Sequence, residues 1–464
     1  MCFLLLLGKK YEKELLKVLV GMLSTVNRIR SILRLIRDKN IIYDCRVSKK
    51  DFTRNSPLNF ENLLLLLLND NGLTRYMEIR RFFKKIKEFT VSKAAFSKGR
   101  LKLKPDAFKI LKNKHLSEFY STNEVKKFKG HIILCGDGSK CILPSITYLK
   151  KIFGGIKNKF GKITTVAMNT TMIYDCLNKF SIEFDLDKYE VSEKELIKRN
   201  MKNIRKLDYL KDEKKIFLFD RGFPSIEFFI DLLENNEKFL FRIKKIAYKT
   251  EKMTMNSSDE FIDILITKAR MNHIKDLKLK EKLLKMEKIN LRVTKITLPN
   301  GEEEHLISNL DKETFTYNDL KDLYNLRWGI EVSFDTLKNL LQIEKVSGYS
   351  EIAVKQDYFS QILAYNIATD IENTAQKKLE EKQKLNNEMN KINKKINKNL
   401  IIGIIKDDLI EISIIKEEEI QIKMLKNIIE EVSRLYTQPS TKKSKRREKK
   451  PYPAKIRSNN SRSF

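Results

Sequence analysis

Four polar residues near the middle of the chain have types and spacing that could support phosphate chemistry. Tyr324, Arg327, Glu331 and Lys338 follow the pattern Y-x2-R-x3-E-x6-K. On an α-helix each residue turns about 100°, so the four side chains fall within a sector of roughly 60°. A carboxylate flanked by two cations and a phenol suits a metal ion bound to a phosphate. Alternatively, the four residues could form a solvent-exposed face without catalytic function, because Arg327 and Glu331 have the i,i+4 spacing of a helical ion pair.

A buried stripe must hold this polar face in place. Apolar residues recur at 3–4 spacing about 90° around the same helix, which predicts one helix over 322–343 that is anchored in a core. The stripe consists of Leu323, Leu326, Ile330, Phe334, Leu337 and Leu341.

Two aspartates follow apolar runs that read as buried strands. Asp137 ends the run 131–137, and Asp220 ends the run 215–220. With Glu331 they form a set of three carboxylates that could hold two Mg²⁺ ions, which bind oxygen ligands and activate phosphodiester cleavage. Each residue alone also has an ordinary interpretation: the aspartates as turn formers at strand ends, and Glu331 as a solvated helix residue.

The charge of the chain favours a polyanionic partner. Its 464 residues carry 93 Lys and Arg against 61 Asp and Glu, a net charge of +32, which indicates nucleic acid. Within the basic first quarter, Ser92 could cap a short helix that presents Lys93, Lys98 and Arg100 to DNA, although a plain basic surface helix is equally compatible. Double-stranded DNA is therefore the expected partner.

The cysteines, the histidines and the lengths of the apolar runs argue against a zinc protein and a membrane protein. The five cysteines form no C-x-x-C pair and the four histidines are scattered, which argues against a zinc site and favours reduced thiols. No apolar run is long enough to cross a bilayer, so we expect no membrane partner. These features predict a cytoplasmic protein, associated with the nucleoid when bound to DNA.

The pattern of apolar, charged and turn-forming residues divides the chain into regions. Residues 1–125 read as a helical, DNA-binding region, and strands alternate with helices over 126–350, which predicts an α/β catalytic domain. Within it, residues 239–310 are mostly β, with a hairpin turn at Pro299-Asn300-Gly301. Residues 351–436 read as helical. Residues 437–464 form a basic tail that we expect to be disordered.

Four apolar residues in the C-terminal region keep 4–3–4 spacing. They predict a helical hairpin rather than a coiled coil, since two heptads are too few. They are Leu385, Met389, Ile392 and Ile396.

Taken together, the motifs resemble the DDE transposases of the insertion-sequence-four class of bacterial mobile elements. The Y-R-E-K helix matches that family's signature, residues 136–139 (Gly-Asp-Gly-Ser) look like its first acidic motif, and residues 219–223 (Phe-Asp-Arg-Gly-Phe) look like its second. Residues 52–54, 91–96 and 347–348 strengthen the likeness, which covers roughly residues 45–370.

The resemblance implies an RNase H-like catalytic core with a mainly β insertion, plus helical N-terminal and C-terminal regions. It implies that Asp137, Asp220 and Glu331 are catalytic and hold two Mg²⁺ ions, with Mn²⁺ as a substitute. Five further residues would contact DNA besides Lys93, Lys98 and Arg100. One of them, Trp328, could instead simply pack between the helix and its neighbours. Of these, the resemblance assigns Tyr324, Arg327 and Lys338 to phosphates, and we add Arg221 and Trp328 beside the motif residues Asp220 and Arg327.

The implied activity is cut-and-paste transposition of an insertion sequence by metal-dependent DNA cleavage and strand transfer, performed by a homodimer on DNA. Two alternatives remain open from the sequence. One is an RNase H-like DNA nuclease without strand transfer, and the other is an inactive DNA-binding remnant of a transposase.

Overall fold

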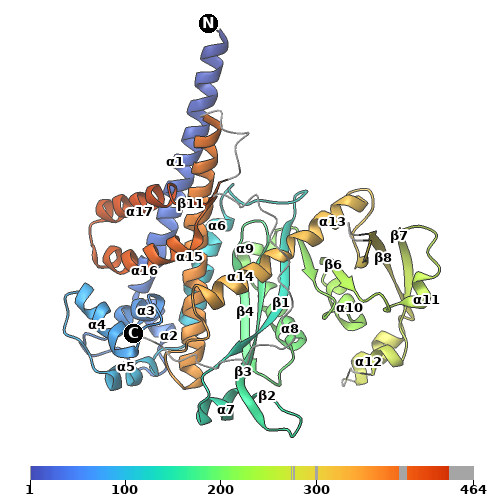
Figure 1. Cartoon of the computed structure of the whole chain (residues 1–464), viewed down its shortest axis with the longest axis horizontal. Helices are drawn as coiled ribbons and strands as arrows, with labels where there is room; N and C mark the ends of the chain where they lie inside the picture. The colour runs from blue at the N-terminus through green and yellow to red at the C-terminus, as the bar shows by residue number, and fades with distance from the viewer. Residues whose placement is uncertain (1, 273, 275–276, 298–300, 386–393, 438–464) are drawn as a thin grey trace.

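The computed structural model describes residues 2–272, 274, 277–297, 301–385 and 394–437 (Figure 1). Its centre is a mixed sheet in which β4, β3, β1, β5 and β6 lie side by side in that order. Strands β1, β3 and β4 form an antiparallel meander, and β5 and β6 run parallel to β1. This order and these directions are those of an RNase H-like core, so the predicted α/β fold class is confirmed. The strands are β1 Ile132–Ile142, β3 Ile163–Asp175, β4 Ser181–Lys188, β5 Lys215–Phe219 and β6 Lys238–Ile243, with the short β2 Gly155–Lys157 on the edge of β3.

The segment between Asp220 and Glu331 extends this same sheet. β9 (Glu303–Ser308) pairs antiparallel with β6, β8 (Lys288–Thr297) with β9, and β7 (Asp259–Leu265) with β8. The helices α11 (Lys249–Lys252), η1 (Ala269–Met271) and α12 (Leu277–Leu284) lie in the connections. The hairpin between β8 and β9 is confirmed by the pairing of Thr297 with Glu303, while residues 298–300 of its turn lie outside the described residues.

Both faces of the central sheet are covered, and the fully buried residues of its middle strands β1, β5 and β6 are mostly apolar. One face carries stacked phenylalanines, among them Phe219 and Phe241, whose ring centroids lie 4.9 Å apart. On this face lie α8 (Glu193–Ile204), α9 (Asp208–Lys211) and α10 (Ile226–Glu234). The other face packs against α13 (Tyr317–Leu326), α14 (Trp328–Asn339) and α15 (Glu351–Leu385). The helix α7 (Thr147–Phe153) packs against β3 and β4.

The N-terminal and C-terminal helices form one layer, although hundreds of residues separate them in the sequence. Figure 1 shows α1 beside α15, with the N-terminal end of α1 projecting from the body. Within this layer, Arg28 of α1 forms a buried ion pair with Asp370 of α15 at 2.7 Å. The other helices are α2 Lys39–Cys45, α3 Phe60–Leu68, α4 Arg75–Lys85, α5 Lys93–Arg100, α6 Asp106–Tyr120, α16 Lys398–Ile414 and α17 Glu418–Val432.

The C-terminal region differs from the sequence prediction at Ile396, and part of it lies outside the described residues. Ile396 does not continue a helix but belongs to β10 (Lys395–Ile396), which pairs with β11 (Tyr436–Thr437). The hydrogen bonds of that ladder replace the helix that the apolar spacing predicted. Met389 and Ile392 lie outside the described residues, and so does the basic tail 438–464. Within the described part of the chain, no helix combines the length and the apolar character needed to cross a bilayer.

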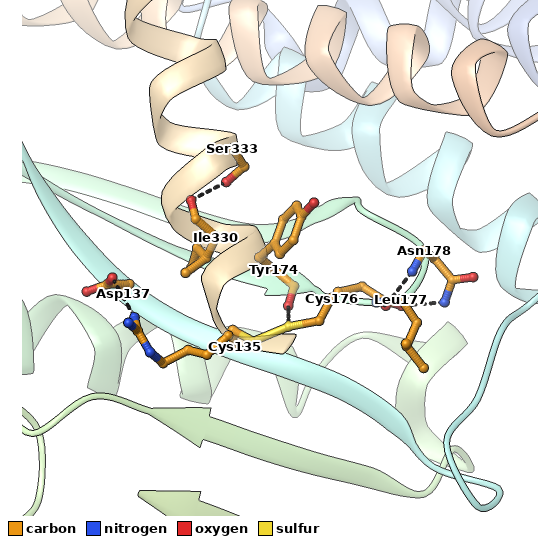
Figure 2. The surroundings of a disulfide bond; sticks show 10 residues. Cys135, Asp137, Tyr174, Cys176, Leu177, Asn178, Ile330 and Ser333 are labelled. Carbon is orange, nitrogen blue, oxygen red and sulfur yellow. Dashed lines mark hydrogen bonds and ion pairs between the residues drawn. A yellow bond between two sulfur atoms is a disulfide. The ribbon is translucent and has the colours of Figure 1, made fainter. Parts of the chain in front are cut away.

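The prediction of reduced thiols is wrong for two of the cysteines. Cys135 of β1 and Cys176, which directly follows β3, are joined by a disulfide (Figure 2). The antiparallel pairing of β1 with β3 brings together residues that are 41 positions apart in the sequence, with their Cα atoms 6.5 Å from each other. Strand pairing of this kind cannot be seen in cysteine spacing. Cys45 and Cys141 remain free and buried.

Candidate active site

Adjacent strands of the core place two carboxylates next to each other. β1 and β5 pair in parallel up to Gly136 and Phe219, and Asp137 and Asp220 are the next residues on the two strands. Asp137 does not end its strand as the sequence suggested, because β1 continues to Ile142 along β3. It lies instead at the point where pairing with β5 stops. The two acidic residues therefore lie side by side at the end of the parallel pairing between β1 and β5.

The helices α13 and α14 carry the Y-R-E-K motif to this end of the strand pairing. A capping box at Thr316 begins α13, with Asp319 as its reciprocal partner. The single helix expected over 322–343 is in fact two consecutive helices, α13 ending at Leu326 and α14 beginning at Trp328. Arg327 lies between them and donates its backbone N–H to the Tyr324 carbonyl, three residues back, rather than four. The predicted apolar stripe is buried except for Leu326, which is partly buried.

Arg327 and Tyr324 connect the three predicted catalytic carboxylates. The Arg327 guanidinium lies 3.3 Å from Oδ2 of Asp137 and also forms an ion pair with Glu331. The Tyr324 hydroxyl donates to Oδ1 of Asp220 at 3.2 Å. Carboxylates from three separated segments of the sequence thus meet around one arginine and one tyrosine.

Burial controls the ionisation of this group. It raises the pKa of Asp137 to about 6, against the opposing effects of the Gly138 N–H and Arg327, and the nearby Asp220 and Glu193 raise it further. Burial alone would lower the pKa of Arg327, but Tyr324, Glu331 and the two aspartates outweigh it, so the pKa is raised. Arg327 therefore stays charged, and its Nε has no partner among the described residues.

The donor set fits a divalent metal ion in its chemistry. Three carboxylates supply the oxygen ligands that Mg²⁺ and Mn²⁺ prefer. Their present arrangement is closed, because Arg327 lies between Asp137 and Glu331. Among the described residues, no group of three His, Cys, Asp or Glu side chains has the geometry of a metal site. Binding a metal here requires the guanidinium to move.

The other predicted DNA-contacting residues of the motif lie around this group. Lys338 of α14 is half-buried, and an N–H of its ammonium group donates to the Lys140 carbonyl of β1 at 2.7 Å. Trp328 is 65% exposed and does not pack between the helix and its neighbours. Arg221 is exposed next to Asp220.

The predicted basic helix is present, but one of its three cations does not face solvent. Ser92 caps α5, as predicted, by accepting the Ala95 N–H, and Lys93 and Lys98 are exposed. The expected DNA contact by Arg100 is wrong. This side chain is 3% exposed and forms an ion pair with Asp357 of α15 at 2.7 Å. A buried guanidinium that already has a carboxylate partner cannot reach a phosphate.

Two residues near the site were missed from the sequence. Glu193, at the first turn of α8, reaches over Gly138, where an added Cβ would lie 2.5 Å from the Glu193 carboxyl carbon. Arg242, near the end of β6, forms an ion pair with Glu304 at 2.7 Å. Its charge lowers the pKa of Tyr324, against the larger opposing effect of burial. Both residues lie in segments without a distinctive motif. The one local signal is the Ser192 cap directly before Glu193, which marks the start of α8 but not a role for Glu193.

Comparison with known proteins finds a family that is similar to the middle of the chain. Residues 150–367 match a family model described as "Transposase DDE domain". This segment is therefore similar to the DDE domain of transposases. The matched segment contains Asp220 and Glu331, and Asp137 lies upstream of it. A domain of this family implies an enzyme that uses divalent metal ions for nuclease and transesterification chemistry.

A solved structure is also similar to this chain. It is described as "Cryo-EM structure of piggyBac transposase synaptic complex with hairpin DNA", with 11% sequence identity and a TM-score of 0.43. The match covers 86% of this chain and 84% of that one. Among curated proteins, none matches the chain.

Proposed function

We propose that this protein is a DNA transposase that catalyses cut-and-paste transposition of an insertion sequence of the insertion-sequence-four class. The observation that carries the proposal is the meeting of Asp137, Asp220 and Glu331 around Arg327 and Tyr324. The Y-R-E-K motif supplies Tyr324, Arg327 and Glu331 of this cluster. The acidic motifs 136–139 and 219–223 supply the two aspartates, and the family match supports the chemistry.

In the proposed active site, the three carboxylates hold two Mg²⁺ ions, or Mn²⁺ in their place. Metal ions held by these carboxylates would supply the chemistry that activates a water or hydroxyl nucleophile and stabilises the leaving oxygen of the phosphodiester. Tyr324 orients Asp220 through its hydroxyl. Arg327 neutralises Asp137 and Glu331 in the present arrangement. We propose that it turns to a DNA phosphate when metal and DNA bind, because a guanidinium can contact phosphate bidentately.

The proposed DNA surface extends from this site to the N-terminal helices. Lys338, Arg221 and the exposed Trp328 lie around the carboxylates, and Lys93 and Lys98 lie on α5. The net charge of +32 supports binding to double-stranded DNA at the element ends and at the target. We propose a homodimer on DNA, because two element ends must be processed together. The helical residues 1–125, the catalytic residues 126–350 and the helical residues 351–436 are its proposed regions.

A plasmid assay tests this function. The substrate carries a marker between the DNA segments that flank this gene, and the purified chain is added with Mg²⁺ or Mn²⁺. We expect an excised fragment and then marker DNA joined to a second plasmid. Asp220→Asn should abolish both products, whereas Asp322→Asn, an exposed residue of α13, should retain them.

Each other outcome removes part of the proposal. Cleavage without joined product would favour a nuclease. No cleavage by the wild-type chain would reject the activity, and unchanged cleavage by Asp220→Asn would reject the assigned role of this carboxylate.

A further inference from the structure

The segment that follows Asp137 carries positive charge only. Residues 138–174, which complete β1 and then form α7, β2 and most of β3, contain six lysines and no acidic residue, although the chain has 61 Asp and Glu among 464 residues. Figure 1 shows α7 and the β2–β3 hairpin at the end of the molecule away from the N-terminal end of α1. Such a segment favours contact with a polyanion.

The helix of this segment lies on the same face of the sheet as Asp137. Asp137 pairs with Met172 of β3, and paired residues point to the same face, as do residues two apart along a strand. Met168 therefore points to the face of Asp137. The helix α7 packs against β3, and its Leu149 and Phe153 are buried in the same apolar core as Met168. Thus α7 covers the face that carries the catalytic carboxylates.

On this face, α14 runs along β1 from the carboxylates toward the basic segment. Arg327, at the start of α14, lies 3.3 Å from Asp137. Lys338, in the last turn of α14, donates to the carbonyl of Lys140, three residues further along β1. Because β3 is antiparallel to β1, the β2–β3 hairpin lies beyond the end of β1 in this same direction.

Most lysines of α7 and the hairpin have no acidic partner among the described residues. Lys151, Lys159 and Lys162 are exposed and Lys150 is partly buried, and none of the four forms an ion pair there. Lys157 has only a distant partner, Glu190 at 3.9 Å. Ammonium groups gathered without carboxylates repel one another, and the phosphates of a nucleic acid would offset this repulsion.

The turn between β2 and β3 holds an aromatic ring at its tip. The Asn158 side chain accepts the backbone N–H groups of Phe160 and Lys162, each at 3.0 Å, and the Asn158 N–H donates to the Lys162 carbonyl at 2.9 Å. Gly161 supplies the positive φ of 74° that the turn requires. These bonds fix Phe160 in a position where it is 79% exposed, with Lys159 and Lys162 close to it in the chain.

A phenyl ring between lysines is better suited to DNA than to another protein. Lysine is depleted at protein–protein interfaces, so this hairpin has the wrong composition for one. The ring cannot bond to a phosphate, but DNA-bending proteins insert phenylalanine between base pairs, which partly unstacks them and bends the duplex. Lysines beside the ring would then contact the phosphates of the same base pairs.

We infer that α7 and the β2–β3 hairpin bind duplex DNA beside the active site, with Phe160 inserted between base pairs. Met172, opposite Asp137, and Ile163, at the base of the turn, are nine residues apart on β3, which corresponds to roughly 30 Å. That distance is close to one turn of the double helix, about 34–36 Å. The hairpin would therefore bend the DNA about one turn away from the cleaved bond. Only the identity of this DNA rests on the proposed function.

Energy transfer between dyes at the two ends of a mixed-sequence duplex of about 20 base pairs tests the inference with the full chain. The wild type should raise the transfer efficiency, because a bend of roughly 20–90° brings the ends closer. Phe160→Ala should remove most of this increase at saturating protein. It should also weaken binding at least about fivefold, through the loss of stacking on a base.

The lysines have a different expected signature. Replacing Lys159 and Lys162 together with glutamine should make the dependence of log affinity on log salt shallower by about two, while the bend at saturation remains. Ile420→Ala and Lys423→Gln are the matched controls, because both residues are exposed on α17, which Figure 1 shows far from the hairpin. Both should bind and bend DNA like the wild type. Circular dichroism should show an unchanged melting temperature for every variant.

The results separate this inference from the proposed function. Wild-type affinity and bending in Phe160→Ala would overturn the inference, and a change in the sedimentation of that variant without DNA would assign the ring to a contact between copies instead. In either case, loss of cleavage in Asp220→Asn would still support the transposase. A wild-type chain that bends DNA through Phe160 but never cleaves it would refute the proposed function and uphold the inference.

Discussion

Replacing Arg100 with glutamine should destabilise the protein without removing a DNA contact. The Arg100 guanidinium is 3% exposed and donates to the side chains of Ser347, Gln356 and Asp357 and to a backbone carbonyl of α15, at 2.7 to 2.9 Å. Removing one partner of a buried ion pair costs about 3–5 kcal/mol, because the other charge stays buried. Ser347 also bonds to Asp357 through its hydroxyl, so the remaining carboxylate keeps one partner. We therefore expect a loss near the lower limit, about 3 kcal/mol.

Urea denaturation followed by circular dichroism measures this loss. With a slope of about 3 kcal/mol per molar urea, the midpoint of the transition that includes α5 and α15 should fall by about 1 M. Lys98→Gln, on the exposed side of the same helix, should change stability by less than about 0.5 kcal/mol. Adding Asp357→Asn to Arg100→Gln should restore part of the stability, because it removes the uncompensated charge.

DNA affinity supplies the contrasting measurement. The folded fraction of Arg100→Gln should bind a duplex like the wild type, whereas Lys98→Gln should bind more weakly, with a shallower salt dependence. An unchanged urea midpoint in Arg100→Gln would refute the reasoning from burial. A loss of affinity equal to that of Lys98→Gln would return Arg100 to the exposed role that the sequence suggested.

Three more changes have defined outcomes. Tyr324→Phe removes the hydroxyl that lies 3.2 Å from Asp220, so the DNA cleavage rate should fall about tenfold with little change in melting temperature. Gly136→Ala places a methyl group 2.2 Å from the Phe219 ring, and this overpacking should cost about 1–3 kcal/mol in thermal unfolding. Asp370→Asn should lower stability by about 3–5 kcal/mol at pH 7. Despite burial, which alone would raise it, the pKa of Asp370 is lowered by Arg28 and His115, so its stabilisation is present above the unfolded pKa of about 3.9 and is lost as the pH falls below it. The deficit of Asp370→Asn in urea should accordingly shrink on acidification below about pH 4.

The sequence was most informative where chemistry and periodicity lie within one segment. The 3–4 spacing of Leu323, Ile330 and Leu337 predicted the buried side of α13 and α14, and that side determines which way Tyr324, Arg327 and Glu331 point. Strand ends were read from apolar runs, which located Asp220 correctly and Asp137 only approximately. Helix spacing survives the small break at Arg327 because this residue keeps right-handed helical backbone angles.

Partners that are distant in the sequence explain most of the differences. Arg100 looked like a surface cation because Asp357, which neutralises it, lies on α15, 257 positions away. Lys338 fits the motif, but its present partner is a backbone carbonyl of β1, which no spacing rule reveals. Cys135 and Cys176 were read as separate thiols because their meeting depends on the register between β1 and β3. In each case, the missing information is the tertiary neighbour rather than the local structure.

Arg327 explains how three carboxylates can be held together before any metal arrives. Gathering negative charges at one strand edge is unfavourable, and the raised pKa of Asp137 reports part of that cost. The guanidinium offsets it by contacting Asp137 and Glu331 at once, while the Tyr324 hydroxyl donates to Asp220. In the proposed mechanism, a metal ion held by these carboxylates would stabilise them in the same way with a higher charge. Arg327 lies at the junction of α13 and α14, where a change in its side-chain torsions would leave both helices in place. The same residue can therefore stabilise the site without metal and be released toward a phosphate when metal binds.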